Sequence, residues 1–365
     1  MKIVIITTEP SGDFLGHHII KSLKKRSKKH KISGVGGELM ESIGFKSWVP
    51  IKKFNTIGLF EVLIRILKYL EIFRFVEKKI RKFNPDLIIT IDSPSFSYRL
   101  AKRLQDLRRL RKIKFVHYVA PTVWAWKSYR AKIFAKFYDF MFTIFCFESK
   151  YFLKYGLKTK YIGHQIFFEK TKKIKKKKQI CFLPGSRSVE IKNNLNSMRN
   201  IIINSRKEFH DFKFYILTFD NHIKLIDKML NGLNVEIISD YKKKQTVMAE
   251  SYLAIAASGS VTLELSKYHT PMIVVYNTYF LTRIILKMLV RVKYASIINI
   301  TFNKEVVPEY IFEKFKCENV LKKMRILIKD KSERQKQIMF LKKFSMKMTL
   351  KGKNPADLLI DEVIN

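Results

Sequence analysis

Short apolar runs alternate along the chain with longer segments in which apolar residues recur every three or four positions. Residues 3–7 have the first pattern and predict a buried strand, and a second strand is predicted at residues 31–35. Residues 15–25 have the second pattern and predict a basic amphipathic helix. Residues 9–13 contain a proline and a glycine, which predicts a turn. A strand, loop and helix that repeat in this way favour an α/β fold with parallel sheets.

The alternation continues to the carboxyl-terminal third of the chain. Further strands are predicted at residues 86–92, 114–119, 140–147, 160–163, 179–183, 212–218, 235–238, 253–257 and 272–276. The lysine-rich run at 170–178 is typical of a solvated linker.

This pattern, together with the length of 365 residues, predicts two domains. We expect an amino-terminal Rossmann-like domain at residues 1–166, a basic linker at 167–178 and a second Rossmann-like domain at 179–344. Residues 345–365 are predicted to form a helix that packs back on the first domain.

The charge is extreme, because 72 lysines and arginines stand against 31 acidic residues and give a formal net charge of +41. Such an excess indicates an anionic partner. The charge alone does not decide whether this partner is nucleic acid, acidic lipid or a phosphorylated substrate. The three cysteines, Cys146, Cys181 and Cys317, have no metal-ligand spacing. The first residues form a strand pattern and not a signal peptide, so we expect a cytoplasmic protein.

Two segments are candidates for contact with a membrane surface. No apolar run reaches the length of a spanning helix. Residues 58–80 predict a long helix with a wide apolar arc, which is either core or a surface in contact with lipid, and residues 279–294 predict a second, basic amphipathic helix. We therefore expect at most a peripheral association with an anionic membrane.

Polar side chains follow two of the predicted strands in the first domain. Asp92 lies at the carboxyl end of the strand at 86–92, where parallel sheets bind ligands, and could act as a general base or cap the next helix. Trp124 and Trp126 occur in the loop after the strand at 114–119 and could pack a domain edge or contact a sugar or lipid. Glu9 and Asp13 are rival candidates for a base, although capping or shaping of a ligand site fits their turn better.

The second domain has two candidate anion sites. Pro184-Gly185-Ser186-Arg187 follows the strand at 179–183, and the arginine fork suits a diphosphate. Ser258-Gly259-Ser260 opens a helix whose amino-terminal N–H groups favour anions, and Glu264 could accept hydrogen bonds from ribose. An ordinary turn and a capped helix are the alternatives. Two Rossmann-like halves with these features suggest a GT-B glycosyltransferase.

Several motifs, in order and in spacing, resemble the lipid-A-disaccharide synthase family. They are Glu9-Pro10-Ser11-Gly12-Asp13, Ile91-Asp92-Ser93-Pro94-Ser95-Phe96, His117 to Trp126, Ile162-Gly163-His164, Leu183 to Arg187 and Ser258 to Glu264. The Trp-Ala-Trp stretch is the most specific of them.

The resemblance implies an inverting transfer from UDP-2,3-diacylglucosamine to 2,3-diacylglucosamine 1-phosphate, which gives a β-1,6-linked lipid A disaccharide 1-phosphate and UDP. It implies no metal and no cofactor, and a peripheral place on the inner face of the inner membrane. Asp92 and Arg187 are then the catalytic residues. The implied donor-side residues are Arg187, Ser258, Gly259, Ser260, Thr262, Glu264 and Asn299, and the acceptor-side residues are Glu9, Ser11, Gly12, Asp13, Trp124 and Trp126.

The chain also departs from the family pattern. Ser95 stands where the family commonly has an acid, and Cys146 and Gln165 stand where it has prolines. Ser95 leaves Asp92 as the single base if the family mechanism holds. Two other functions stay open: a UDP-sugar epimerase of the same architecture, and a basic nucleic-acid-binding protein, for which no recognisable nucleic-acid-binding module is found.

Overall fold

The computed structural model describes the chain except for residues 55–61, 170–173, 280–282, 285–291 and 365, and except for the side chains of 62–67 and 351. The chain divides into two compact units. Unit 1 consists of Met1–Phe168 and Met348–Asn365, and unit 2 consists of Glu169–Lys347.

Unit 1 is built on a seven-stranded sheet in the order β3-β2-β1-β4-β5-β6-β7, in which all neighbours are parallel. The strands are β1 (Lys2–Thr7), β2 (Lys31–Val35), β3 (Lys46–Ser47), β4 (Leu87–Ile91), β5 (Lys114–Tyr118), β6 (Phe140–Thr143) and β7 (Lys158–Tyr161). The helices are α1 (Pro10–Arg26), α2 (Glu38–Glu41), α3 (Val62–Phe83), α4 (Pro94–Arg103), α5 (Gln105–Arg111), α6 (Arg130–Phe137) and α7 (Lys150–Leu153), with short 3₁₀ turns η1 (Ile51–Phe54) and η2 (Gln165–Phe168).

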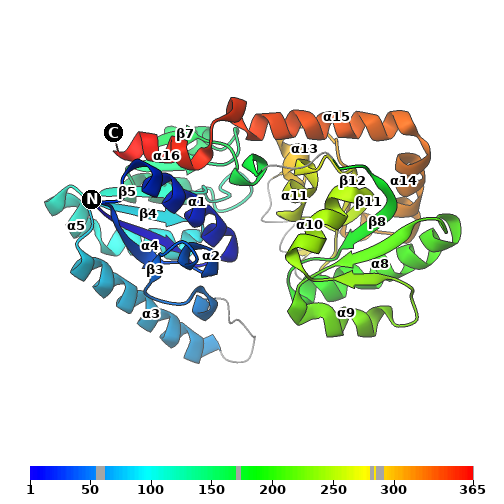
Figure 1. Cartoon of the computed structure of the whole chain (residues 1–365), viewed down its shortest axis with the longest axis horizontal. Helices are drawn as coiled ribbons and strands as arrows, with labels where there is room; N and C mark the ends of the chain where they lie inside the picture. Colours follow the sequence, from blue (N-terminus) through cyan, green and yellow to red (C-terminus); the bar gives the residue numbers. More distant parts are fainter. Residues whose placement is uncertain (55–61, 170–173, 280–282, 285–291, 365) are drawn as a thin grey trace. The chain divides into compact units, whose positions relative to one another are not determined.

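Helices cover both faces of this sheet, with α1 on one face and α3 and α4 on the other (Figure 1). The strands are therefore buried on both sides, which is why β1 and β4 read as continuous apolar runs. Phe73, Val76 and Ile80 of α3 pack in the core beside Phe96 and Leu100 of α4. The sheet places the carboxyl ends of β4 and β5 next to each other, since Ile91 pairs with Tyr118.

Unit 2 has a six-stranded parallel sheet in the order β10-β9-β8-β11-β12-β13. The strands are β8 (Lys177–Leu183), β9 (Lys213–Leu217), β10 (Glu236–Ile238), β11 (Ser251–Ala257), β12 (Met272–Tyr276) and β13 (Glu309–Ile311). The helices are α8 (Ser188–Glu208), α9 (Ile223–Leu230), α10 (Tyr241–Glu250), α11 (Val261–Lys267), α13 (Ile297–Phe302), α14 (Cys317–Lys329) and α15 (Lys331–Met348), with 3₁₀ turns η3 (Asp220–His222) and η4 (Phe312–Lys314). Two Rossmann-like parallel sheets confirm the predicted α/β fold class.

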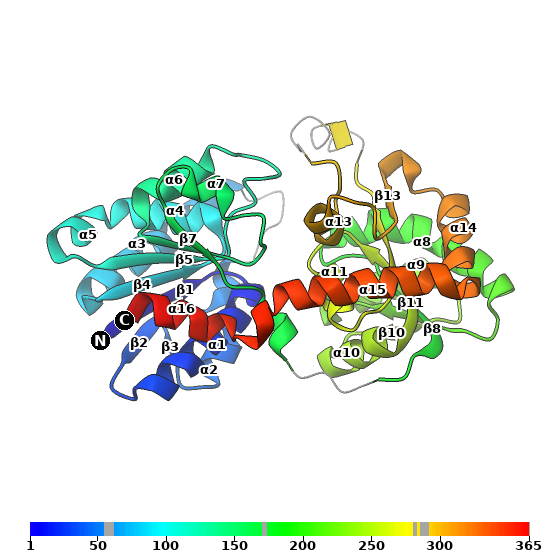
Figure 2. The ribbon, with the colours of Figure 1, turned by 90° about the horizontal axis from the view of Figure 1, so that it is seen from above.

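The end of the chain returns to unit 1 through α15, a 3₁₀ turn η5 (Leu350–Gly352) and α16 (Pro355–Ile364). Residues 345–365 belong to unit 1 from Met348 onward, but they are not the single helix predicted, because Gly352 adopts a positive φ of 85° and Pro355 begins a new helix. α16 lies beside α1 (Figure 1, Figure 2). There Ser22 donates a hydrogen bond to Asp357 at 2.5 Å, and Arg26 forms an ion pair with Asp361.

Two further predictions need correction, and a third falls mostly outside the described residues. The predicted turn at 9–13 is the first part of α1, because proline is accommodated in the first turn of a helix. The predicted strand at 140–147 ends at Thr143, where the Glu148 carboxylate accepts hydrogen bonds from the backbone N–H groups of Ile144 and Phe145. The helix expected at 279–294 lies mostly outside the described residues, as do the side chains of Leu63 and Leu67 in the arc at 58–80.

The predicted linker is also less solvated than its composition indicated. Strand β8 begins at Lys177, inside the range 167–178. The ammonium group of Lys176 donates to the carbonyls of Ala249 and Tyr268 and to Oγ1 of Thr270, at 2.8, 3.3 and 2.6 Å. Burial lowers the pKa of Lys176 to about 8. This lysine therefore fastens the start of β8 to the neighbouring elements of unit 2.

Candidate functional site

Asp92 follows β4 directly and has an unusual backbone conformation. Its φ is 53°, that of Ser93 is 48°, and such left-handed values are uncommon for residues other than glycine. The Asp92 N–H donates to the Tyr118 carbonyl at 2.9 Å, and the Ser97 hydroxyl donates to the Asp92 carbonyl at 2.7 Å. These bonds hold the strained turn in place at the carboxyl edge of the sheet.

The Asp92 carboxyl is buried enough to change its acidity. Oδ1 accepts one hydrogen bond, at 2.8 Å from the N–H of Ser93. Burial, and to a lesser extent the negative charge of Glu9, raise the pKa of Asp92 to about 6, and the Ser93 bond opposes this rise. A carboxylate with this pKa is a stronger base than an exposed one and is still mostly ionised at neutral pH.

A short chain of hydrogen bonds joins Glu9 to the same turn. Thr8 Oγ1 donates to Ser93 Oγ at 2.6 Å, and Ser93 Oγ donates to Glu9 Oε1 at 3.1 Å. Glu9 is itself exposed. The structure thus brings Glu9 and Asp92 into one carboxylate pair connected by Ser93.

The rest of the motif at 11–13 has a structural setting. Asp13 is buried and accepts hydrogen bonds from the N–H groups of Gly37, Leu39 and Met40, at the start of α2. A Cβ on Gly12 would stand 1.9 Å from Thr7 Oγ1, so this glycine allows α1 to approach β1. Ser11 is exposed on the first turn of α1.

The two tryptophans follow β5 and differ in their surroundings. Trp124 is partly buried, and its indole N–H donates to Glu148 Oε1 at 3.2 Å. Trp126 is 36% exposed and lies beside the cations of Lys127 and Arg130. Trp126 is the member of the pair that a ligand can reach.

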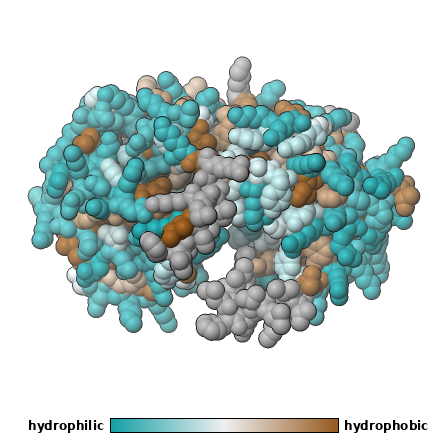
Figure 3. All heavy atoms as spheres, turned by 180° about the vertical axis from the view of Figure 1, so that it is seen from behind, coloured by the Kyte–Doolittle hydropathy of each residue, from teal (hydrophilic) through white to brown (hydrophobic). Residues whose placement is uncertain are grey.

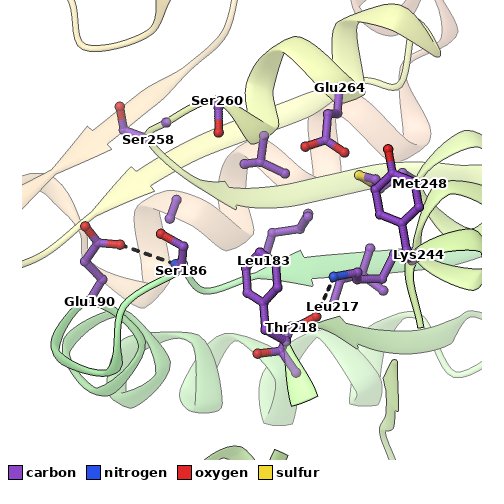
Figure 4. A pocket seen from close by; sticks show the side chains of 16 residues that line it. Leu183, Ser186, Glu190, Leu217, Thr218, Lys244, Met248, Ser258, Ser260 and Glu264 are labelled. Atoms are coloured by element: carbon purple, nitrogen blue, oxygen red, sulfur yellow. Dashed lines mark hydrogen bonds between the residues drawn. The ribbon is translucent and has the colours of Figure 1, made fainter. Parts of the chain in front are cut away.

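In unit 2, a pocket lies at the carboxyl ends of β8, β9 and β11 (Figure 4). Among the predicted donor-side residues, Ser258, Gly259, Ser260 and Glu264 line it. Ser186 also lines it and donates its N–H to Glu190 Oε2 at 3.3 Å. Figure 4 shows the Glu264 carboxylate directed into the pocket from α11.

The lining of the pocket carries both signs of charge and suits a polar ligand. Burial raises the pKa of Glu264, and the charges of Lys244 and Lys267 lower it by less. Lys244 lines the pocket and donates to the Thr218 carbonyl at 2.8 Å, and its burial lowers its own pKa. Glu264 therefore offers a carboxyl acceptor beside a lysine cation.

Three other predicted donor-side residues do not line this pocket. The Arg187 side chain is 82% exposed and makes a loose 3.5 Å pair with Glu190. Thr262 is buried and donates to the Gly259 carbonyl at 2.8 Å. Asn299 is fully buried, where it bonds to the backbone of Val306 and Val307 and to Glu309. The contacts of Thr262 and Asn299 stabilise the local backbone, at the start of α11 and before β13 respectively.

Comparison with known proteins decides the family. A sequence model described as lipid-A-disaccharide synthetase matches residues 3–363. The lipid-A-disaccharide synthase of Rickettsia prowazekii (strain Madrid E) is 34% identical over 376 residues, which cover 100% of this chain and 98% of that one. The chain belongs to the lipid-A-disaccharide synthase family. It is a glycosyltransferase of lipid A biosynthesis, as the resemblance predicted.

A second relative agrees with this assignment, and solved structures share the fold. The lipid-A-disaccharide synthase of Rickettsia bellii (strain OSU 85-389) is 37% identical over 356 residues, covering 92% of this chain and 91% of that one. A UDP-GlcNAc 2-epimerase from Neisseria meningitidis bound to UDP-GlcNAc aligns with a TM-score of 0.67 over 100% of this chain and 99% of its own, at 13% identity. The spinosyn rhamnosyltransferase SpnG aligns with a TM-score of 0.65 over 100% of both chains, at 10% identity. At such low identity these structures show the shared GT-B-like fold alone.

Sequence reasoning missed Glu148, which lies near the synthase family's Trp-Ala-Trp segment. Its side chain is buried and accepts hydrogen bonds from Trp124 and from the N–H groups of Ile144 and Phe145. Burial raises the pKa of Glu148 to about 8, and the N–H donors oppose this rise. The one signal in the sequence is an acidic residue directly after the apolar run at 140–147.

His117 is buried on β5, beside β4, and does not resemble an acid–base residue. One ring nitrogen lies 2.7 Å from Thr90 Oγ1, and burial lowers the pKa of His117 to about 3. The ring is therefore neutral at physiological pH. Among the described residues, no group of three His, Cys, Asp or Glu side chains is placed to hold a metal ion.

Proposed function

We propose that Asp92 is the general base of the transferase reaction. Its carboxylate takes the proton of the 6-hydroxyl of 2,3-diacylglucosamine 1-phosphate while that oxygen bonds to the anomeric carbon of the donor sugar. The bond between this carbon and the diphosphate oxygen breaks, and UDP leaves with the electron pair. Attack opposite to the leaving group gives inversion and the β-1,6 linkage.

The observation that carries this proposal is the setting of Asp92 at the carboxyl end of β4. The residue has a strained backbone that several hydrogen bonds stabilise, and a pKa raised to about 6. Strain and a perturbed pKa are features that often gather at catalytic residues. Glu9 is the supporting member of the pair in this proposal, because its charge keeps Asp92 basic.

The pocket of unit 2 is the proposed site for UDP. The backbone at Ser186 and at 258–260 would face the diphosphate, and Glu264 would accept hydrogen bonds from ribose hydroxyls. Arg187 is well exposed next to this pocket, so its guanidinium is free to turn toward a diphosphate and stabilise the leaving group. Thr262 and Asn299 act in this proposal as supports of the binding loops.

Asp92→Asn tests the assignment of the base. The purified variant, incubated with both diacylated sugars, should release UDP about 10²- to 10⁴-fold more slowly than the wild type, because an amide cannot accept the proton. Its affinity for UDP in calorimetry should be unchanged. The matched control is Asp106→Asn, which makes the same change at an exposed residue of α5 paired with Arg81. Near-normal turnover of Asp92→Asn would remove Asp92 from the mechanism.

The enzyme is also proposed to act at the inner face of the cytoplasmic membrane as a peripheral protein. None of the described helices is both long and apolar enough to cross a bilayer. The acyl chains of the two substrates favour a reaction at the lipid surface, since each exposed CH₂ costs about 0.8 kcal/mol in water. The net charge of +41 supports attraction to anionic lipid.

The apolar contribution to membrane binding is proposed to come from α3. Leu70 and Phe75 on this helix are 41% and 43% exposed. Hydrophilic residues cover most of the face drawn in Figure 3, and its apolar residues lie in small groups between them. Small exposed groups of this kind suit a reversible association and not a deep insertion.

A further inference from the structure

A cationic cluster lies in unit 1, in the loop that follows β5 and at the start of α6. The ammonium of Lys127 is 4.2 Å from the centre of the Trp126 ring, and the guanidinium of Arg130 is 5.7 Å from it. The ring thus holds two positive charges close together, through cation–π contacts that restrict both side chains. We call Trp126, Lys127 and Arg130 the Trp126 cluster.

The charges of this cluster are not neutralised within the part of the chain that the structure describes. Arg130 donates one hydrogen bond, from Nη2 to the hydroxyl of Ser95 at 3.0 Å, and its buried Nε has no described acceptor. Neither cation forms an ion pair with a carboxylate among the described residues. Arg103 and Arg108 of the same unit, by contrast, pair with Glu77 and Asp139. A buried N–H without an acceptor is costly, so the site has room for a hydrogen-bond acceptor, and the two unpaired positive charges favour an anionic one.

The cluster lies close to the proposed base. Ser95 is in the first turn of α4, three residues after Asp92, and that turn contains no acidic residue. The positive end of this ten-residue helix adds to the two cations. Since β4 and β5 are neighbours in the sheet, the loop with the Trp126 cluster and the turn with Asp92 lie at the same edge.

We propose that Lys127 and Arg130, together with the Ser95 hydroxyl, bind the phosphate of the acceptor sugar. This inference rests on the proposed function, in which the acceptor presents its 6-hydroxyl to Asp92. The acceptor carries its phosphomonoester at the opposite end of the sugar ring, where it needs cations a short distance from the base. A guanidinium and an ammonium bind a phosphate through strong charge-assisted hydrogen bonds. The site therefore selects phosphorylated acceptors and orients the ring.

The test compares two acceptors that differ only in the phosphate: 2,3-diacylglucosamine 1-phosphate and 2,3-diacylglucosamine. Wild-type enzyme should prefer the phosphorylated acceptor. Lys127→Gln with Arg130→Gln should raise the KM for that acceptor about 10- to 100-fold, the usual loss for charge-assisted contacts. The KM for the UDP-sugar donor and kcat/KM for the unphosphorylated acceptor should stay near the wild-type values. Arg130→Lys should recover part of the preference.

Lys132→Gln is the matched control, because it removes an exposed positive charge from the same helix, two residues from Arg130. It should leave the preference intact, and far-UV circular dichroism checks that each variant is folded. An equal loss with both acceptors would overturn the proposal, as would a wild-type enzyme that does not distinguish them. If the cluster instead attracts anionic lipid headgroups, the double variant should react more slowly with both acceptors alike and should bind vesicles more weakly; that result would also overturn the proposal. If the wild type uses neither acceptor, the proposed function itself is wrong, and this inference is wrong with it.

Discussion

At the scale of single residues, the acidity of Asp92 sets how activity depends on pH. A general base works only when it is deprotonated, so kcat/KM should fall as the pH drops through about 6, the raised pKa of Asp92. Glu9→Gln removes the nearby negative charge that contributes to this rise. The acidic limb of the profile should then move to lower pH by less than about one unit, because burial is the larger cause.

Rates measured between about pH 5 and 9, a range that brackets this pKa, check the expectation. The amide oxygen of the introduced glutamine can still accept the hydrogen bond from Ser93, so the geometry of the turn is preserved. Glu41→Gln, at an exposed position of α2 in the same unit, is the control and should leave the profile unchanged. An acidic limb that stays in place, or moves upward, in Glu9→Gln would contradict electrostatic coupling between the two carboxylates.

Single residues also mark the limit of prediction from sequence. Asp92 could be placed at the end of a strand because the apolar run before it is unambiguous. The surroundings of Glu148 and Lys176 could not be predicted, because the partners of these side chains are mostly backbone groups and residues distant in sequence. Asn299 is a further case, since the resemblance implies a place on the nucleotide side, whereas the hydrogen bonds of its side chain to Val306, Val307 and Glu309 could not be predicted from the sequence.

At the scale of elements, local patterns decided where prediction succeeded. Strands β2 and β12 have the predicted bounds. β12 is a short apolar run, whereas β2 contains a lysine, a serine and a glycine and ends at the glycines that follow Val35. Strand β6 is shorter than predicted, because the apolar residues after Thr143 are buried in a turn and not in the sheet. Composition and periodicity report burial, and they do not distinguish a buried strand from a buried turn.

The docking of α16 on unit 1 gives an element-scale prediction. Leu359 is fully buried, whereas Leu358, the neighbouring residue of the same type, is only half-buried. Leu359→Ala should lower the free energy of unfolding of unit 1 by about 2–5 kcal/mol, because the truncated side chain leaves a cavity. Leu358→Ala is the matched control and should cost about 1 kcal/mol or less.

Urea titrations followed by tryptophan fluorescence measure this difference. All three tryptophans, Trp48, Trp124 and Trp126, belong to unit 1, so their emission reports that unit within the full chain. Equal midpoints for the two alanine variants would mean that α16 contributes little to the stability of unit 1.

At the scale of the whole molecule, charge and apolar surface should contribute to membrane binding in different ways. The excess of basic residues attracts anionic lipid, and this attraction is screened by salt, since the Debye length falls from about 10 Å at 0.1 M to about 3 Å at 1 M. Burial of exposed apolar side chains in the interface is not screened. Binding that persists at high salt therefore measures the apolar contribution.

Sedimentation with vesicles separates the two contributions. Wild-type protein should bind vesicles rich in phosphatidylglycerol more strongly than pure phosphatidylcholine vesicles at about 0.1 M salt, and this difference should shrink at about 1 M salt. Leu70→Ser combined with Phe75→Ser should reduce the binding that remains at high salt about tenfold or more, because burial of each side chain contributes about 1.5–3 kcal/mol. Both residues are exposed, so this variant should stay folded.

Leu110→Ser on α5, where the leucine is 82% exposed, is the control and should bind as the wild type does. Unchanged high-salt binding of the double variant would show that α3 is not the membrane-contacting surface, and a vesicle preference that does not respond to salt would exclude the electrostatic contribution.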